Sequence, residues 1–249
     1  MHGHAGRVFF PAMIPLRDDN PSELRPMVTV ALLASITLVF AWQLSLGSTG
    51  GARIVYSLGL IPAVLFGIAP LPAELSVVPP GATILTSMFL HGGWFHLIGN
   101  GLYLWIFGDN VEDAMGHAKF MVFYLLCGIA AALAQAVPDP QSTMPMIGAS
   151  GAISGVLGAY LLLYPRARVL VVIPIGFYMQ TTRLPAAVVL LLWFGLQFLS
   201  SLLAAQGSGG VAFRAHLGGF VAGLLLVGLF KRRGFRLSNP LRAGSRHAD

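Results

Sequence analysis

Charged residues and cysteine are both scarce in this chain. Only 10% of its 249 residues are Asp, Glu, Lys or Arg, whereas 56% are hydrophobic. A water-soluble domain carries about a quarter of its residues as charged side chains, so this composition excludes an ordinary soluble protein and indicates one embedded in lipid. The single cysteine, Cys127, excludes an internal disulfide and a CxxC redox or zinc site. We expect Cys127 to face lipid or to pack in the core.

The apolar residues gather in six segments, at 27–46, 84–107, 120–137, 148–164, 185–204 and 211–230. About 20 residues at ~1.5 Å each cross a ~30 Å hydrocarbon core. We therefore predict an all-α polytopic membrane domain of six transmembrane helices over residues 27–230. A cytoplasmic segment (1–26), which lacks the apolar run of a signal peptide, precedes it, and a basic cytoplasmic tail (231–249) follows. The long outer loop, 47–82, is apolar but broken by prolines, so we expect it in the membrane interface or partly re-entrant.

The basic residues predict the orientation of these spans. If the N-terminus is cytoplasmic, only Arg53 and Arg214 of the fifteen Lys and Arg residues fall on the outer side. The positive-inside rule then predicts that both termini are cytoplasmic and that the number of spans is even. The net charge of +6 belongs to this inner face and to anionic lipid head groups. We therefore expect the lipid bilayer, and no nucleic acid, as a partner.

Polar residues inside the spans are informative because a buried polar group needs a partner. His96 and Asn100, four residues apart, share one face of the second segment. Ser150 begins the fourth segment and His216 lies within the sixth, and both segments carry stripes of small residues that allow close helix packing. We expect these two helices to bring Ser150 and His216 together. The stripes are Gly151, Gly155 and Gly158 in the fourth segment, and Ala212, Gly219 and Gly223 in the sixth.

The depths of these residues agree with one another. Each height is counted from the inner end of the residue's own helix, at ~1.5 Å per residue. Ser150 then lies about 24 Å above the inner interface, His216 about 22 Å and His96 about 20 Å, with Asn100 somewhat lower. Three separate helices therefore place polar side chains at nearly one height, toward the outer side. Asp109, Glu112 and Asp113 lie at the inner end instead, and no carboxylate is at this depth.

This set of residues suits nucleophilic acyl transfer. A serine becomes a nucleophile when a base takes its proton, and His216 is the candidate base. The start of a helix at Ser150 offers free backbone N–H groups to a developing oxyanion, and His96 and Asn100 are further donors. Because an acidic third member is missing, a Ser–His dyad is the most that the sequence supports. No metal or cofactor is implied.

Each signal alone also has an ordinary structural explanation. Stripes of small residues usually mean helix packing, and a membrane serine such as Ser150 or Ser154 commonly bonds a backbone carbonyl one turn earlier. We expect His91 to lie at the outer interface. A non-catalytic membrane protein that binds and escorts or retains transmembrane clients is the alternative to an enzyme. A transporter is disfavoured because no span holds a carboxylate for ion coupling.

Three stretches resemble the rhomboid family of intramembrane serine proteases: residues 91–100 (HGGWFHLIGN), 148–155 (GASGAISG) and 215–223 (AHLGGFVAG). The resemblance implies a six-helix rhomboid-like bundle with Ser150 as nucleophile and His216 as general base. It implies His96, Asn100 and the Ser150 backbone amide as oxyanion stabilisers. It also implies that the substrates are single-span or multi-span membrane proteins, and that the fifth helix acts as a lateral gate. We expect Gly148, Gly151 and Gly219 to support the site.

The stretch 13–21 resembles bacterial members, so a bacterial inner membrane is expected. Two residues depart from the family pattern. Ser154 stands where some members carry an aromatic residue that stacks on the histidine, so the His216 ring must be supported from elsewhere. Arg214 stands where relatives often carry an aromatic residue, which implies a more polar rim.

Overall fold

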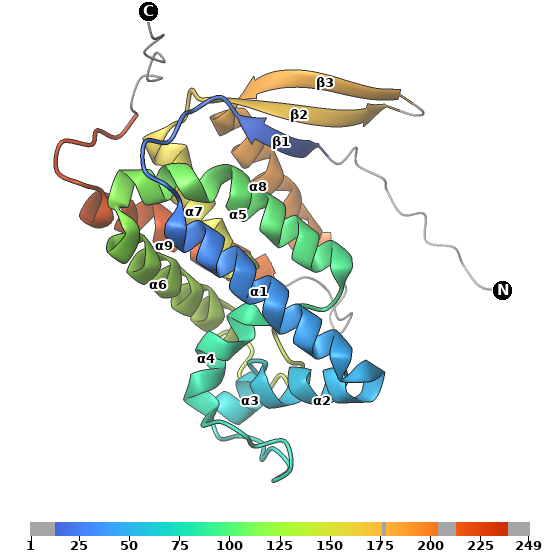
Figure 1. The fold of residues 1–249 in the computed structure, drawn as a ribbon. Coiled ribbons are helices and arrows are strands. Elements are labelled where there is room, and N and C mark those ends of the chain that lie inside the picture. Colours follow the sequence, from blue (N-terminus) through green and yellow to red (C-terminus); the bar gives the residue numbers. More distant parts are fainter. Residues whose placement is uncertain (1–12, 176–177, 204–212, 239–249) are drawn as a thin grey trace, which may run out of the picture.

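A computed structural model describes residues 13–175, 178–203 and 213–238. Most of these residues belong to six long helices, one for each predicted apolar segment (Figure 1). Ala212, the first twelve residues and the tail beyond residue 238 were part of the sequence predictions and lie outside the described residues. The long helices are α1 (Met27–Ser45), α5 (Trp94–Met115), α6 (His117–Ala136), α7 (Ser150–Leu163), α8 (Ala186–Leu203) and α9 (Phe213–Phe230).

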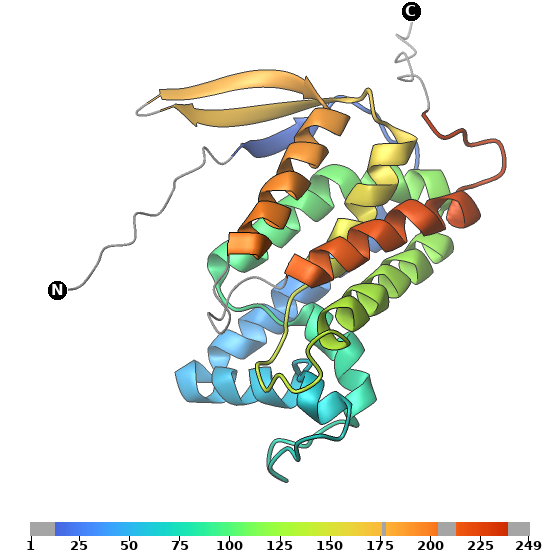
Figure 2. The ribbon, with the colours of Figure 1, turned by 180° about the vertical axis from the view of Figure 1, so that it is seen from behind.

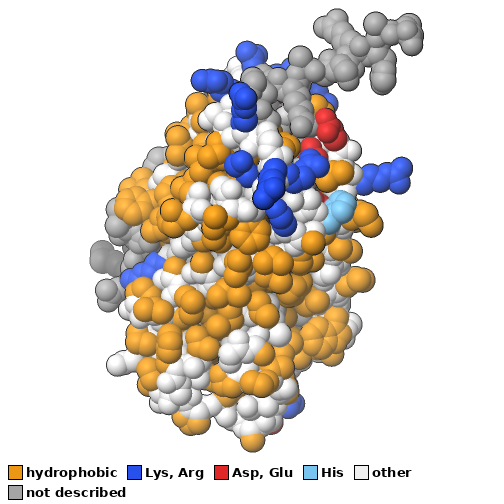
Figure 3. Space-filling model, turned by 90° about the vertical axis from the view of Figure 1, so that its left-hand side faces the viewer, with side chains coloured by type: hydrophobic (Ala, Val, Ile, Leu, Met, Phe, Trp, Pro, Cys, Tyr) orange, Lys and Arg blue, Asp and Glu red, His pale blue; other side chains and the backbone are white. Residues whose placement is uncertain are grey.

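The helix surfaces agree with a membrane environment. Among the described residues, α1, α6 and α9 are each long and apolar enough to cross a membrane, while α7 and residues 186–196 of α8 form shorter apolar helices. In Figure 3 hydrophobic side chains cover the middle of the molecule and Lys and Arg side chains gather at one end. We call this the basic end; α1, α6 and α8 begin there, and α5, α7 and α9 end there. The opposite end is called the site end.

The predicted second segment, 84–107, differs from the helix that forms. Residues 83–89 make two short turns, α4 (Thr83–Thr86) and η2 (Ser87–Phe89), and α5 starts only at Trp94, after an extended Leu90 and the glycines at 92 and 93. At its other end α5 continues to Met115, because the carboxylates in its last turns have partners. The prolines of 47–82 divide that loop, as expected, into α2 (Gly47–Leu58), α3 (Pro62–Leu65) and η1 (Pro80–Ala82).

The all-helical prediction is wrong in one respect, because the chain also forms a small sheet. Its three antiparallel strands, in the order β1-β2-β3, are β1 (Ile14–Asp18), β2 (Arg168–Ile175) and β3 (Tyr178–Pro185). The β-branched run of β2 favours a strand, and Val169 and Val171 point from one face of it into the core with no exposed surface. Figures 1 and 2 show the sheet lying across the basic end, where α7 ends and α8 begins.

Helix α7 is the central element of the bundle, with residues Gly151–Tyr160 all buried. Its glycines allow α9 to approach until the two backbones touch, as the stripes of small residues predict. A Cβ atom added to Gly219 would overlap the carbonyl oxygen of Gly151, and one added to Gly223 would overlap that of Gly155. Cys127 of α6 is buried and packs against Gly155, so it belongs to the core.

A buried carboxylate joins three helices at the basic end. The first turn of α1 has amide N–H groups that the helix itself leaves unpaired. Glu112 of α5, with no exposed surface, accepts hydrogen bonds from Val28 N (2.9 Å), Thr29 N (2.8 Å) and Thr29 Oγ1 (2.7 Å). His117, at the start of α6, lies 2.6 Å from the same carboxylate through Nδ1. The negative charge also suits the positive end of the α1 dipole.

Candidate active site

Ser150 occupies the first position of α7, at the site end. The chain reaches it through Gly148, whose φ of +121° is a conformation that L side chains rarely adopt. A Cβ atom at Gly148 would come within 2.6 Å of the His96 ring, and the Gly148 N–H donates to the Ser87 carbonyl at 2.8 Å. Glycine is therefore required beside Ser150 both for backbone conformation and for space.

The Ser150 and His216 side chains meet in a hydrogen bond. His216 Nε2 of α9 and Ser150 Oγ of α7 are 2.8 Å apart. The backbones of these two helices touch nearby, at Gly219 and Gly151. For the serine hydroxyl to donate, Nε2 must be unprotonated, so the neutral ring carries its proton on Nδ1. His216 Nδ1 is buried and has no hydrogen-bond partner among the described residues. The pair therefore has the contact that proton transfer needs, but no carboxylate behind it.

Aromatic rings, rather than a carboxylate, surround the His216 ring. Trp193 of α8 lies with its ring centroid 5.8 Å from that of His216 at an interplanar angle of 36°, and Phe213 makes an edge contact at 6.5 Å. Ser154, where an aromatic residue is missing from α7, donates its hydroxyl to the Ser150 carbonyl at 2.7 Å. This is the ordinary bond to the preceding turn, so Ser154 gives the histidine no support.

The orientation of Asn100 is set by His91, a residue that the sequence placed at the outer interface. Its side chain is buried within the protein, at 2% exposure. Its Nδ1 lies 3.3 Å from the Phe89 carbonyl, so Nδ1 carries the proton and Nε2 accepts from Asn100 Nδ2 at 2.9 Å. One N–H of the Asn100 amide is then engaged, and the other remains for a ligand.

Sequence reasoning missed this role because a second support comes from far away in the chain. The backbone N–H of His91 donates to Gln43 Oε1 of α1 at 3.0 Å, across 48 residues. Gln43 is itself buried, at 5% exposure. A glutamine within the first apolar segment was the only available signal, since a buried amide needs a partner.

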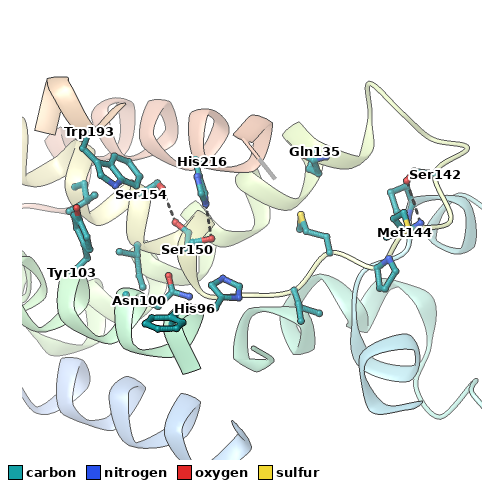
Figure 4. Close-up of a pocket in the computed structure, with 18 of the residues that line it drawn as sticks. His96, Asn100, Tyr103, Gln135, Ser142, Met144, Ser150, Ser154, Trp193 and His216 are labelled. Carbon is teal, nitrogen blue, oxygen red and sulfur yellow. Dashed lines mark hydrogen bonds between the residues drawn. The ribbon is translucent and has the colours of Figure 1, made fainter. Parts of the chain in front are cut away.

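His96 has a defined tautomer as well. The Gly92 N–H donates to His96 Nδ1 at 3.4 Å, so the proton of the neutral ring is on Nε2, the nitrogen that lies toward Gly148. In Figure 4 His96 and Asn100 lie on one side of Ser150 and His216 lies on the other. Two potential donors therefore stand across the serine from the potential base, which is the arrangement that an oxyanion requires.

These groups line a cavity of about 640 Å³. Tyr103 and Trp193 form apolar walls near the serine, and the α6–α7 connection supplies the wall toward the site end (Figure 4). Asp139 is the one carboxylate among the described lining residues. Within the described part of the chain no cluster of three His, Cys, Asp or Glu side chains is arranged for a metal ion. The cavity thus presents a serine, a histidine and amide donors to whatever enters it.

A serine and a histidine from two apolar helices thus meet at a cavity, in a chain with helices long and apolar enough to cross a membrane. The rhomboid domain family model matches residues 81–233, which is more than half of the chain and includes all three motifs. The chain therefore belongs to the rhomboid family, as the resemblance implied.

Individual relatives agree with this assignment. Rhomboid protease GluP of Bacillus subtilis is 32% identical over 202 residues, covering 80% of this chain and 34% of GluP. Rhomboid protein 1, mitochondrial, of Saccharomyces cerevisiae is 28% identical over 194 residues, covering 70% of this chain and 52% of the relative. Rhomboid-like protein 11, chloroplastic, of Arabidopsis thaliana is 28% identical over 162 residues, covering 62% and 54%. The chain spans about a third to a half of the length of these relatives.

Proposed function

We propose that this chain is an intramembrane serine endopeptidase, which hydrolyses peptide bonds in or near the transmembrane segments of other membrane proteins. One observation carries the proposal: Ser150 Oγ lies 2.8 Å from His216 Nε2, at the wall of a cavity large enough for an extended peptide. Membership of the rhomboid family and the similarity to a relative named as a protease support it.

In the proposed reaction His216 acts as the general base and Ser150 as the nucleophile. As Ser150 Oγ attacks the scissile carbonyl carbon, its proton passes to His216 Nε2. The C–N bond then breaks, and the same proton passes from Nε2 to the leaving amine. A water molecule, deprotonated by Nε2, attacks the acyl-enzyme ester, and the proton returns to Ser150 Oγ as the carboxylic acid product leaves. Peptide and water are consumed, and the enzyme is regenerated.

The oxyanion formed in each step is stabilised by hydrogen-bond donors fixed in advance. The Ser150 backbone N–H, at the start of α7, has no partner within its own helix. His96 offers Nε2–H because its Nδ1 accepts from Gly92, and Asn100 offers the amide hydrogen that His91 does not use. Such fixed donors typically contribute 10²- to 10³-fold each to the rate.

The proposed topology has six spans, formed by α1 and α5–α9, with both termini in the cytoplasm of a bacterium. The gathering of Lys and Arg at the basic end supports an inward orientation of that end (Figure 3). The site then opens toward the outer side, and the substrates are single-span or multi-span membrane proteins. A substrate helix must unwind locally to present its carbonyl to Ser150, so helix-breaking residues near the cleaved bond favour cleavage.

Cleavage in a reconstituted membrane tests this function. The full chain is incorporated into liposomes with a fluorescently labelled single-span protein, and the products are identified by mass. We expect two fragments cut in or near the span, with none from Ser150→Ala or His216→Ala. Cleavage that persists in Ser150→Ala overturns the assignment. If no variant cleaves but wild type and Ser150→Ala both retain the span protein on affinity capture, the chain is a non-catalytic binder of membrane clients.

A further inference from the structure

The His216 ring lacks the polar contact that usually fixes such a base. Its Nε2 contacts Ser150, but the buried Nδ1 has no hydrogen-bond partner among the described residues. A single hydrogen bond leaves the ring free to rotate about its line to the serine. Helix α7 does not restrain it either, because Ser154 bonds the Ser150 carbonyl instead. The orientation of the base must come from packing.

Trp193 supplies a ring contact of the right kind. Its centroid is 5.8 Å from that of His216 and the planes are tilted by only 36°, within the range in which aromatic pairs attract. Behind it, Tyr103 of α5 lies 5.7 Å away at 43°. Trp193 is therefore held between a residue of α5 and the imidazole of α9. It is also part of the cavity wall, so a bound substrate lies next to it.

We infer that Trp193 is the main positioning residue for the His216 base, closer than the edge contact of Phe213 and in the place of the aromatic residue that α7 lacks at Ser154. This inference rests on the proposed function. Trp193 acts through the imidazole and not on the reacting atoms. The base is thus oriented by α8, a different helix from the one that carries the nucleophile. A shift of α8 away from α9 would separate Trp193 from His216, so the position of α8 sets the competence of the base.

Phe194, the neighbouring residue, provides a matched control. It stacks on Phe220 of α9 with centroids 4.7 Å apart at 25°, so it joins the same two helices without contacting the imidazole. Replacing Phe194 by leucine removes an aromatic contact between α8 and α9 but leaves Trp193 in place. Replacing Trp193 by leucine removes the contact to the base. If Trp193→Leu loses activity and Phe194→Leu does not, the loss comes from the contact to the base and not from helix packing in general.

The test compares Trp193→Leu, Trp193→Phe and Phe194→Leu with wild type in liposomes, measuring kcat and KM for a single-span substrate. It also measures the rate at which a small fluorophosphonate labels Ser150, which does not depend on docking of a substrate helix. We expect Trp193→Leu to lower kcat and the labelling rate about 3- to 10-fold, the worth of one aromatic pair. KM should change less. Trp193→Phe should retain most of the activity, and Phe194→Leu should keep the wild-type kcat.

A second-site variant separates positioning from loss of folding. Ser154→Tyr, placed in the Trp193→Leu background, returns an aromatic ring to the histidine from α7, and we expect it to recover labelling. Thermal melting checks that every variant is folded. An unchanged or higher kcat in Trp193→Leu would overturn the inference, and a higher kcat would instead make Trp193 a barrier to substrates. An equal loss in Phe194→Leu, or no recovery in a folded double variant, would also overturn it. If wild type itself neither cleaves nor labels, the proposed function fails instead.

Discussion

Glu112 at the basic end and His216 at the site end are both buried polar side chains in apolar surroundings, but their hydrogen-bonding atoms are satisfied to different degrees. At the basic end Glu112 has partners on both oxygens, from Val28, Thr29 and His117. At the site end His216 Nδ1 has no partner among the described residues, and Asn100 keeps one N–H free of His91. Buried polar groups are normally paired, so a complete set indicates a structural role and an incomplete set beside a cavity indicates a reactive one.

The close backbone contact between α7 and α9, which holds Ser150 beside His216, should be the feature most sensitive to mutation. Gly219→Ala places a methyl group against the Gly151 backbone, which cannot move without shifting α7. We expect loss of at least 100-fold in substrate cleavage, because a displacement of about 1 Å of a catalytic group has effects of this size. The control is Gly228→Ala on the same helix, where a Cβ atom meets nothing within 4 Å. It should keep full activity, and an inactive Gly228→Ala would show that α9 tolerates no change.

At the basic end a change should reduce stability and spare the chemistry. Glu112→Ala leaves the buried N–H and hydroxyl of Thr29 and the partly buried N–H of Val28 without an acceptor, and we expect a loss of about 3 kcal/mol in the free energy of unfolding. Thermal or denaturant unfolding in detergent measures this. Per folded molecule, kcat should stay at the wild-type value. The exposed Glu74 serves as control, with no loss expected in Glu74→Ala. If Glu112→Ala lowers kcat but leaves the free energy of unfolding unchanged, the role of Glu112 is not structural and the contrast with the site end fails.

The effects of mutating Asn100 and His91 should be coupled, because His91 orients the Asn100 amide. Asn100→Ala removes a proposed oxyanion donor, and we expect kcat to fall about 100-fold. His91→Ala should have a smaller effect, roughly 10-fold, because it only frees the Asn100 amide to rotate. In the Asn100→Ala background, His91→Ala should then add nothing further. Kinetics on all three variants, with melting temperatures alongside, checks this. Fully additive losses would mean that His91 acts by another route.

The smallest expected effect concerns Asp18 of β1, a carboxylate that holds its proton unusually well. Burial, and to a lesser degree the nearby Asp109, raises the pKa of Asp18 from 3.8 to about 7, although Tyr160 donates a hydrogen bond to it. The folded state therefore binds this proton more tightly than the unfolded state does. Stability from this group is fully present below about pH 4, falls as the pH rises toward 7, and is level above that.

Measuring the melting temperature of Asp18→Asn between pH 4 and pH 8 tests this. The variant should show a weaker decline with pH than wild type does. Asp19→Asn alters the adjacent carboxylate, which pairs with Arg183 at 3.4 Å and is the weakest contributor to the raised pKa of Asp18, so the slope should change much less than in Asp18→Asn. If wild type and Asp18→Asn show the same slope, burial does not raise the pKa of Asp18 as described.

Features of the fold that are set by residues close together in the sequence could be predicted, whereas features that need partners far along the chain could not. The packing of α7 on α9 is encoded locally, because Gly151 and Gly155 mark one face of a helix and Gly219 and Gly223 mark one face of another. Once those faces meet, the positions of Ser150 and His216 follow from helical geometry. The six helices likewise follow from continuous apolar runs.

Features that depend on distant partners could not be predicted in the same way. Strand β1 pairs with β2 across about 150 residues, so the apolar β-branched run between two helices does not by itself reveal its partner strand. His91 acquires its role from Gln43, and the His216 ring packs on Trp193 from another helix. In each case the residue type was visible, but its neighbour is fixed only by the folded bundle.

We propose that His216 makes Ser150 a nucleophile, and covalent labelling is the sharpest test of this role. The intact protein in liposomes is treated with a fluorophosphonate, and the modified residue is located by mass spectrometry in wild type, His216→Ala and Ser154→Ala. We expect modification at Ser150 in wild type and in Ser154→Ala, and a rate at least 100-fold lower in His216→Ala. No modification of Ser150 in wild type, or an equal rate without the histidine, would contradict it.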